Sequence, residues 1–290
     1  MAVLKPLAEV LAETGPRTWR AGPVLEARDL HLSFAGVRAV SGVSFQVGPE
    51  ELLAIIGPNG AGKTSLLNCL SGLYRPQRGT VIFLGENVTR AAPHRIARMR
   101  LSRMFQNIEL FENLTVLDNL LLGRHVHVRY GAIAAFAWWG RAKRDELRHR
   151  EVVERVVDFL EIEAWRKHPV GLLPYGIKKR VELGRALAME PRLLLLDEPV
   201  AGMNVEEIED MARFIIDIRE ELRVPMILVE HDMGVVMDLA DRILVLDFGL
   251  QIATGTPDEV QANADVIRAY LGEEHGREPG GEPAGSSQTP

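Results

Sequence analysis

A glycine-rich segment near residue 60 has the residue types and spacing that bind phosphate groups. It fits the pattern G-x-x-x-x-G-K-[ST] and reads Gly57, Pro58, Asn59, Gly60, Ala61, Gly62, Lys63, Thr64. Its glycines let the backbone curl so that successive N–H groups point at phosphate oxygens, and a helix that begins near Thr64 adds the positive end of its dipole. We predict that this loop, with Ser65, binds a nucleoside triphosphate. Lys63 would lie at the β and γ phosphates, and the Thr64 hydroxyl on Mg²⁺.

A pair of acids follows an apolar run at 193–196. That run has the composition of a strand buried on both faces, which places Asp197 and Glu198 at the carboxyl edge of a sheet, where ligands of open α/β sheets bind. We expect Asp197 to hold Mg²⁺ and Glu198 to act as the base on a water, because neighbouring side chains of a strand point to opposite sides. An acidic pair at a strand end can also cap a helix; the phosphate loop upstream favours the catalytic interpretation.

His231 and Gln106 are the remaining polar candidates. His231 follows the next predicted buried strand, 226–230, and we expect it to contact the γ phosphate and hold the attacking water. A lone histidine at a strand end is more often structural, but its position after the acidic pair favours the catalytic role. Gln106 follows Met104 and Phe105, where the sheet pattern gives way to helical patterns, and alone it would indicate nothing.

The elements that must position these residues are visible in the hydrophobic pattern. Four apolar runs, at 52–56, 193–196, 226–229 and 243–246, alternate with helical patterns, which predicts a parallel sheet covered on both faces. From Val24 onward, alternating apolar residues up to 47 predict antiparallel strands. The residues at 247–249 predict a hairpin turn that returns a strand through Leu250 and Ile252.

The middle of the chain, about 93–174, is predicted to be a helical subdomain inserted in the α/β core, without a buried strand. Thr115 and Asp118 have the spacing of a helix N-terminal cap, and valines at 152–157 form a stripe at helical spacing. We therefore expect one domain at 24–273, preceded by a loosely attached extension at 1–23, to which we assign no function, and followed by a disordered tail at 274–290.

Composition narrows the classes of function. The chain has 290 residues, a formal net charge of −6 and a pI near 5.8, which argues against a nucleic-acid partner. Its single cysteine, Cys69, falls in an apolar helical run and is interpreted as a buried hydrophobe. No stretch reaches the roughly 20 apolar residues that cross a bilayer, and the start lacks the pattern of a secretory signal, so we expect a cytoplasmic protein.

Five motifs occur here in the order that is typical of ABC transporter ATPases: the phosphate loop, Gln106, the segment at 173–177, the acidic pair and His231. The likeness extends from Val24 to Leu271. It implies the P-loop NTPase form of the α/β fold and a dimer with a second ATPase subunit, identical or homologous. It also implies that Phe34 stacks on adenine, and that Gln106 contacts the nucleotide and metal and links them to a membrane partner. The segment at 173–177 would be the signature loop, whose Tyr175 and Gly176 amides cap the γ phosphate bound by the other subunit.

The chain departs from the family pattern at two places. Pro174 and Ile177 replace a serine and a glutamine of the usual signature loop, so one hydroxyl and one N–H are missing there. Asn204 replaces the aspartate that most of the family has after the acidic pair. The charged run at 178–180 is interpreted as a solvated helix face. An apolar run at 133–139 is either a packed hairpin tip or a contact with the membrane subunit or lipid.

Finer features resemble the branch that powers importers of branched-chain amino acids and related amides. They are the tyrosine of the signature loop, the run at 199–204, the insert at 123–144 and the ending at 255–271. The resemblance implies an ATPase that uses ATP and Mg²⁺, lies on the cytoplasmic face of the membrane, and works with separate permease subunits and, indirectly, a substrate-binding protein. Two alternatives are the ATPase of a lipid or lipopolysaccharide exporter and a soluble ABC ATPase without a transport role.

Overall fold

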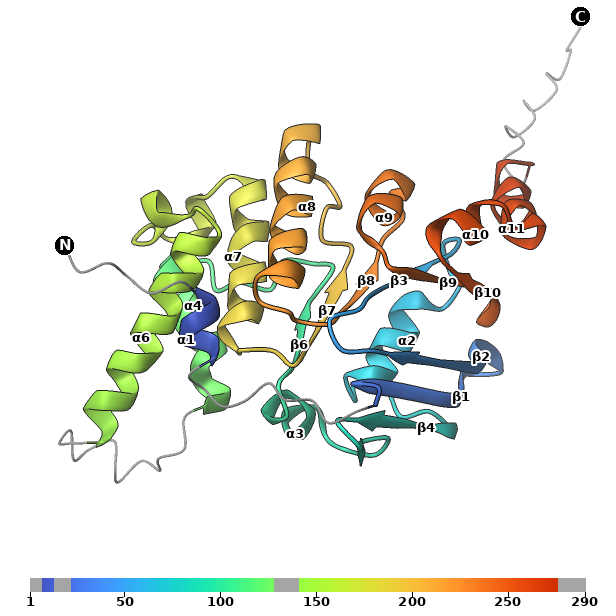
Figure 1. Cartoon of the computed structure of the whole chain (residues 1–290), viewed down its shortest axis with the longest axis horizontal. Coiled ribbons are helices and arrows are strands. Elements are labelled where there is room, and N and C mark those ends of the chain that lie inside the picture. Colours follow the sequence, from blue (N-terminus) through green and yellow to red (C-terminus); the bar gives the residue numbers. More distant parts are fainter. Residues whose placement is uncertain (1–6, 13–21, 128–140, 276–290) are drawn as a thin grey trace, which may run out of the picture.

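The predicted apolar runs form neighbouring strands of a central sheet (Figure 1). The computed structural model describes residues 7–12, 22–127 and 141–275. The strands are β1 (Leu25–Phe34), β2 (Val37–Val47), β3 (Leu52–Ile56), β4 (Arg78–Phe83), β5 (Glu86–Asn87), β6 (Leu101–Met104), β7 (Leu193–Asp197), β8 (Met226–Val229), β9 (Arg242–Asp247) and β10 (Leu250–Gly255). The helices are α1 (Leu7–Ala12), α2 (Lys63–Leu70), α3 (Pro93–Arg98), α4 (Val116–Gly123), α6 (Arg141–Phe159), α7 (Tyr175–Ala188), α8 (Val205–Glu220), α9 (Met233–Leu239), α10 (Pro257–Gln261) and α11 (Ala264–His275).

Within the described residues, the core sheet has the order β10-β9-β3-β8-β7-β6. Strands β9, β3, β8, β7 and β6 pair in parallel, and β10 returns antiparallel to β9 after the turn at 247–249, as predicted. In a parallel sheet all carboxyl ends lie at one edge. The loops that follow β3, β6, β7 and β8, which carry the candidate site, therefore meet along that edge.

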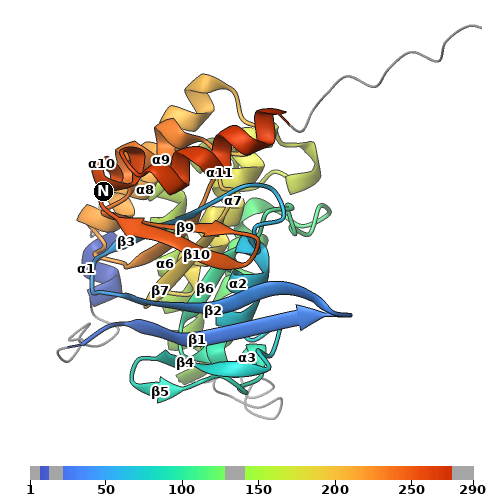
Figure 2. The ribbon, with the colours of Figure 1, turned by 90° about the vertical axis from the view of Figure 1, so that its right-hand side faces the viewer.

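A second sheet, of order β2-β1-β4-β5, is antiparallel and lies beside the core sheet (Figure 2). The alternation from Val24 onward predicted β1 and β2, but β4 and β5 were not predicted. Helix α2 packs between the two sheets: its leucines and Cys69 share one apolar cluster with residues of β1, β2 and β4 and with one face of the core sheet. The core sheet is thus buried on this face by α2 and the antiparallel sheet, and on the other by helices such as α8.

The middle of the chain is mostly helical, as expected. Thr115 caps α4, because its hydroxyl accepts the Asp118 N–H, and the valine stripe of α6 is wholly buried against α4 and α7. The prediction that 93–173 contains no strand is wrong: β6 pairs in parallel with β7 at the edge of the core sheet. Ser102 and Arg103 interrupt the apolar pattern of β6, which hid this strand.

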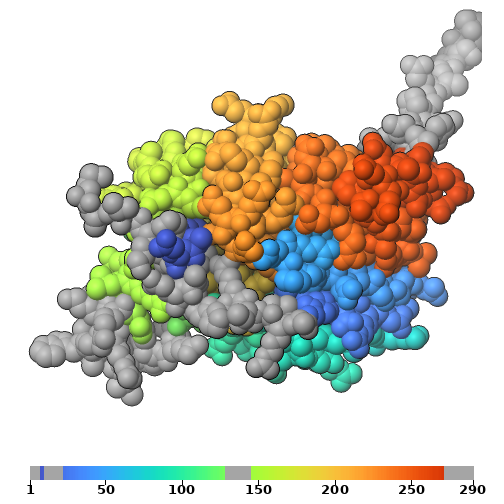
Figure 3. Space-filling model, in the orientation of Figure 1, coloured from blue at the N-terminus to red at the C-terminus, as the bar shows by residue number. Residues whose placement is uncertain are grey.

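Helix α1, the helix described within the N-terminal extension, is attached more firmly than we predicted. Helix α1 lies against α6 in Figures 1 and 3, and Leu7 is buried in the same cluster as the α6 valines. Figure 3 also shows the antiparallel sheet and the C-terminal helices grouped at the opposite end of the molecule. The apolar run at 133–139 and the tail at 276–290 lie outside the described residues.

Candidate active site

The phosphate loop connects β3 to α2, and its glycines are required by close contacts. Gly57 and Gly62 have φ angles of 148° and 98°. A Cβ on Gly57 would lie 2.0 Å from the carbonyl oxygen of Leu246, and one on Gly62 would lie 2.1 Å from that of Ala39. Because both neighbours are backbone atoms, no side-chain movement can make room, and only glycine fits.

Lys63 begins α2 and folds back over the loop. Its side chain is buried, and its Nζ donates to the carbonyl oxygens of Gly57 at 2.6 Å and Pro58 at 3.0 Å. Gly62 is the N-cap and supplies no side-chain cap, and the N–H groups of the first turn of α2 lie at the positive end of the helix dipole. Thr64 is exposed and Ser65 half-buried in that turn. These groups make the positively polarised cradle that the sequence predicted.

Asp197 ends β7 in a buried position, and its two carboxylate oxygens differ. Arg103 Nη2 donates to Oδ2 at 2.6 Å, whereas Oδ1 is buried and has no hydrogen-bond partner among the described residues. Burial raises the pKa of Asp197 above its ordinary value, and the Arg103 guanidinium opposes that rise. An unpartnered buried oxygen fits a cation ligand, because a bound cation would compensate its lost hydration. Asp197 therefore suits the metal role that we predicted for it.

Glu198 and Gln106 are brought into direct contact. Gln106 Nε2 donates to Glu198 Oε2 at 2.7 Å, although the two residues lie 92 positions apart in the chain. Glu198 has a φ of 51°, in the left-handed region, while its N–H donates to Val229 O at 2.8 Å. A non-glycine residue in that region costs free energy. The backbone turns there so that Glu198 leaves the strand beside Gln106.

His231 follows β8 with its side chain exposed and its backbone anchored. The side chain is 63% exposed, and the main-chain N–H donates to Glu230 Oε2 at 2.9 Å. Glu230 is completely buried, and its other oxygen accepts the N–H of Val200 at 3.1 Å. The imidazole is thus exposed to solvent at the carboxyl edge of the sheet, next to the strand that ends in Asp197.

Phe34 lies at the end of β1, on the hairpin beside the phosphate loop. The ring is exposed and packs edge-on against Tyr74, with 5.1 Å between ring centroids. The hairpin meets the loop through the turn after β9: Gly249 N–H donates to Ala61 O, and Ser41 N–H donates to Gly249 O. An exposed aromatic face near the loop is compatible with base stacking, which stays a prediction.

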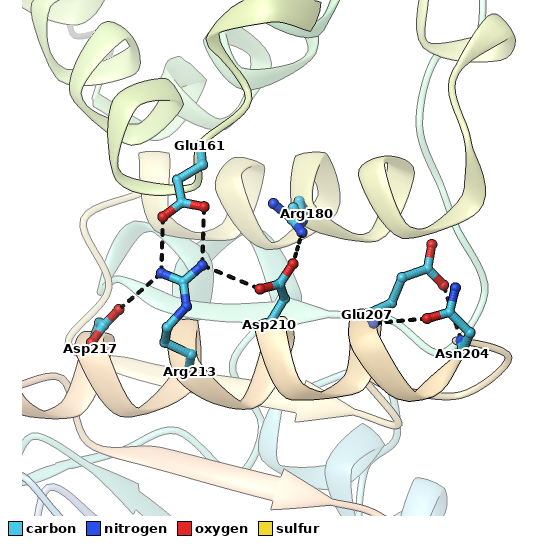
Figure 4. Close-up of polar contacts among 7 residues, drawn as sticks. All are labelled: Glu161, Arg180, Asn204, Glu207, Asp210, Arg213 and Asp217. Atoms are coloured by element: carbon cyan, nitrogen blue, oxygen red, sulfur yellow. Dashed lines mark hydrogen bonds and ion pairs between the residues drawn. The ribbon is translucent and has the colours of Figure 1, made fainter.

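Tyr175 and Gly176 form the first turn of α7, next to the loop at 199–204. Pro174 is the N-cap of α7, and the Tyr175 hydroxyl donates to Ala201 O at 3.0 Å. Asn204 caps α8 in a capping box with Glu207 (Figure 4). An asparagine serves this cap as well as an aspartate, which accounts for that departure from the family pattern.

The prediction of a solvated face at 178–180 is wrong for Lys179. Its side chain is completely buried, and Nζ donates to Gln106 O at 3.1 Å and lies 3.5 Å from Glu198 O. Burial lowers the pKa of Lys179, and the charge of Glu182 opposes that fall. Arg180 forms an ion pair with Asp210 of α8 (Figure 4).

Three residues of this site were not predicted from the sequence: Arg103, Lys179 and Glu230. A charge inside a strand and an acid at the end of an apolar run are signals that could have marked Arg103 and Glu230. Lys179 had no such signal, because its neighbours in the sequence are also basic.

The helices of the described residues contain no segment long and apolar enough to span a bilayer. A family model described as "ABC transporter" matches residues 40–201, and one described as "Branched-chain amino acid ATP-binding cassette transporter" matches residues 251–276.

Relatives of known name cover nearly the whole chain. It is 39% identical to the high-affinity branched-chain amino acid transport ATP-binding protein BraF of Pseudomonas aeruginosa, over 87% of this chain and 98% of that protein. It is 37% identical to LivG of Escherichia coli, a protein of the same description, with the same coverage. The ADP conformation of MJ1267, an ATP-binding cassette of an ABC transporter, superposes with a TM-score of 0.74 at 25% identity, over 87% of this chain and all of that one. The resemblance seen in the five motifs is therefore confirmed, and this chain belongs to the ABC transporter family as an ATP-binding, ATP-hydrolysing subunit of the branch that includes BraF and LivG.

Proposed function

We propose that this chain hydrolyses MgATP at the carboxyl edge of its core sheet, to power uptake of branched-chain amino acids or related amides through separate membrane subunits. One observation carries the proposal. The phosphate loop, the unpartnered Oδ1 of Asp197 and the contact between Gln106 and Glu198 all lie along this one edge. The site thus combines a cradle for a triphosphate, an oxygen for a cation and a carboxylate that Gln106 orients.

Each residue has a role that follows from its surroundings. The loop amides and Lys63 bind the β and γ phosphates, and they hold the triphosphate while charge redistributes. Mg²⁺, held by Asp197, Thr64 and Gln106, would neutralise charge on the phosphate oxygens. Glu198 accepts the proton of the attacking water, with Gln106 fixing one of its oxygens, and His231 contacts the γ phosphate. Phe34 stacks on the adenine.

The site is completed by a second ATPase subunit. The free N–H groups at the start of α7, including those of Tyr175 and Gly176, are suited to an anion presented by another molecule. In a head-to-tail dimer, each nucleotide lies between the phosphate loop of one subunit and the signature loop of the other. Nucleotide binding then closes the dimer, and hydrolysis opens it.

The partners and location follow from the family. Permease subunits docked near Gln106 would convert the cycle into transport, so the chain would lie on the cytoplasmic face of the membrane. The match at 251–276 and the likeness to BraF and LivG support import of branched-chain amino acids over lipopolysaccharide export.

Replacement of Glu198 by glutamine tests the assignment of the base. The variant keeps the hydrogen-bonding shape but cannot accept a proton, so kcat should fall by roughly 100-fold or more while MgATP affinity is kept. Phosphate release and nucleotide titration measure the two quantities. Turnover at the wild-type rate would remove Glu198 from this role.

A further inference from the structure

Glu230 is a buried acid that accepts hydrogen bonds from main-chain N–H groups of two functional loops. Its side chain has no exposed surface. Oε1 accepts the N–H of Val200, in the loop after the acidic pair, at 3.1 Å. Oε2 accepts the N–H of His231 at 2.9 Å and that of Asp232 at 3.4 Å. A buried carboxylate is costly unless such bonds satisfy it, and here they are supplied by two separate loops.

The two loops carry residues whose positions relative to each other must be fixed. Val200 lies two residues after Glu198, and His231 directly follows Glu230. Neither β7 nor β8 fixes the backbone beyond its last residue, and the ladder between the two strands ends at Asp197 and Val229. The Glu198 N–H still donates to Val229 O. Beyond that hydrogen bond, the carboxylate of Glu230 connects the loop after β7 to the loop after β8. The imidazole itself is largely exposed, with its Nδ1 3.6 Å from Glu230 Oε2.

A second link continues from the same loop to the signature helix. Ala201, the residue after Val200, accepts the Tyr175 hydroxyl at 3.0 Å. The loop at 199–204 is therefore held at adjacent residues, by Glu230 on one side and by Tyr175 on the other. The same loop is also held by the hydrogen bond from Ala201 N–H to Glu198 O, at 3.3 Å, and by the Asn204 cap of α8.

We propose that Glu230 is a positioning residue for ATP hydrolysis: its carboxylate locks the loop after the acidic pair to the backbone of His231, and so holds the imidazole in place relative to Glu198. This inference rests on the roles proposed above for Glu198 and His231. Glu230 touches no substrate in this account; it acts through its hydrogen bonds to the main chain and through its contact with the imidazole of His231.

Glu230→Gln separates positioning from binding. Glutamine keeps the volume and one acceptor oxygen, but its NH₂ group would face a backbone N–H. The hydrogen bonds to one of the two loops would therefore be lost. We expect kcat for MgATP hydrolysis by the full chain to fall on the order of 100-fold, as misplacement of a catalytic group by about 1 Å does, and KM to change less than about 3-fold. Glu190→Gln is the matched control, because Glu190 is also buried but pairs with Arg124 away from the site. Its kcat should stay at the wild-type value.

A double-mutant cycle with His231→Ala shows whether Glu230 acts through the imidazole. His231→Ala alone should lower kcat on the order of 100-fold, and adding Glu230→Gln should lower it by less than about 3-fold more, because the positioned group is already gone. If the two effects multiply, or if Glu230→Gln matches the Glu190→Gln control, the positioning role is overturned and the roles of His231 and Glu198 stand. If His231→Ala keeps the wild-type kcat, the role proposed for His231 falls, and this inference falls with it.

Discussion

The ion pair between Arg103 and Asp197 tests whether burial or the number of ion pairs decides how much stability is lost when an arginine is removed. Arg103 Nη2 lies 2.6 Å from Asp197 Oδ2, and the two side chains are 6% and 1% exposed. Arg103 also donates to Asn68 Oδ1 at 2.6 Å, which ties β6 to the helix after the phosphate loop. The perturbation is Arg103→Met, which keeps an unbranched apolar stem and removes the charged guanidinium.

The expected loss is large because Asp197 stays buried. Removing one partner of a buried pair typically costs about 3–5 kcal/mol, since the other charge is left without compensation. For a domain of this size, 1 kcal/mol corresponds to roughly 2–4 °C in Tm, so Tm should fall by about 6–20 °C. The double variant Arg103→Met/Asp197→Asn should regain about 2 kcal/mol or more, because its buried carboxamide is neutral.

Arg213→Met is the control, and it removes more ion pairs than Arg103→Met does. Arg213 contacts Glu161, Asp210 and Asp217 (Figure 4), but its side chain is 44% exposed and that of Glu161 is 55% exposed. Exposed pairs contribute about 0–1 kcal/mol because solvent screens them. Urea unfolding of the three variants and the wild type measures the difference. The reasoning is refuted if Arg103→Met loses no more stability than Arg213→Met, or if the double variant is less stable than Arg103→Met.

Two further predictions concern the glycines of the phosphate loop and the buried Glu182. Gly62→Ala should lower MgATP affinity on the order of 100-fold, because its Cβ would lie 2.1 Å from Ala39 O and its backbone is left-handed. Gly60→Ala has the same backbone strain but no neighbour within 4 Å, so it should lower MgATP affinity by only about 10-fold. Equal losses in calorimetric titrations would contradict the contact argument. Burial raises the pKa of Glu182 from 4.5 to about 7, so the wild type should lose up to about 3 kcal/mol of stability as pH rises from about 4.5 through 7. Glu182→Gln should lack that loss, and identical profiles of Tm against pH in the two proteins would argue against it.

The strands that consist of continuous apolar runs could be predicted from the sequence, because such runs are typical of strands buried on both faces. β3, β7 and β8 were found this way, and the phosphate loop and acidic pair then followed at their ends. β6 was missed because Ser102 and Arg103 break its pattern. Their polar groups are satisfied by tertiary partners, Ala186 O and Asp197, that no local rule identifies.

The same limit explains which site residues were missed. Periodicity treats Lys179 as one basic residue in a basic run, whereas in the fold it faces main-chain carbonyls of Gln106 and Glu198. Glu230 stands at the end of an apolar run, but the sequence does not identify the backbone N–H groups that its carboxylate binds. Motif spacing locates residues that touch a ligand, but the groups that hold those residues depend on contacts between distant loops.

The central claim is that a triphosphate held by the phosphate loop is sealed by a second subunit. Light scattering of the Glu198→Gln variant, with bound nucleotide counted after rapid desalting, tests it most directly. With MgATP, the variant should change from monomer to dimer and retain two ATP per dimer, and Lys63→Ala in the same background should prevent both changes. A Glu198→Gln protein that binds MgATP and stays monomeric would contradict the account.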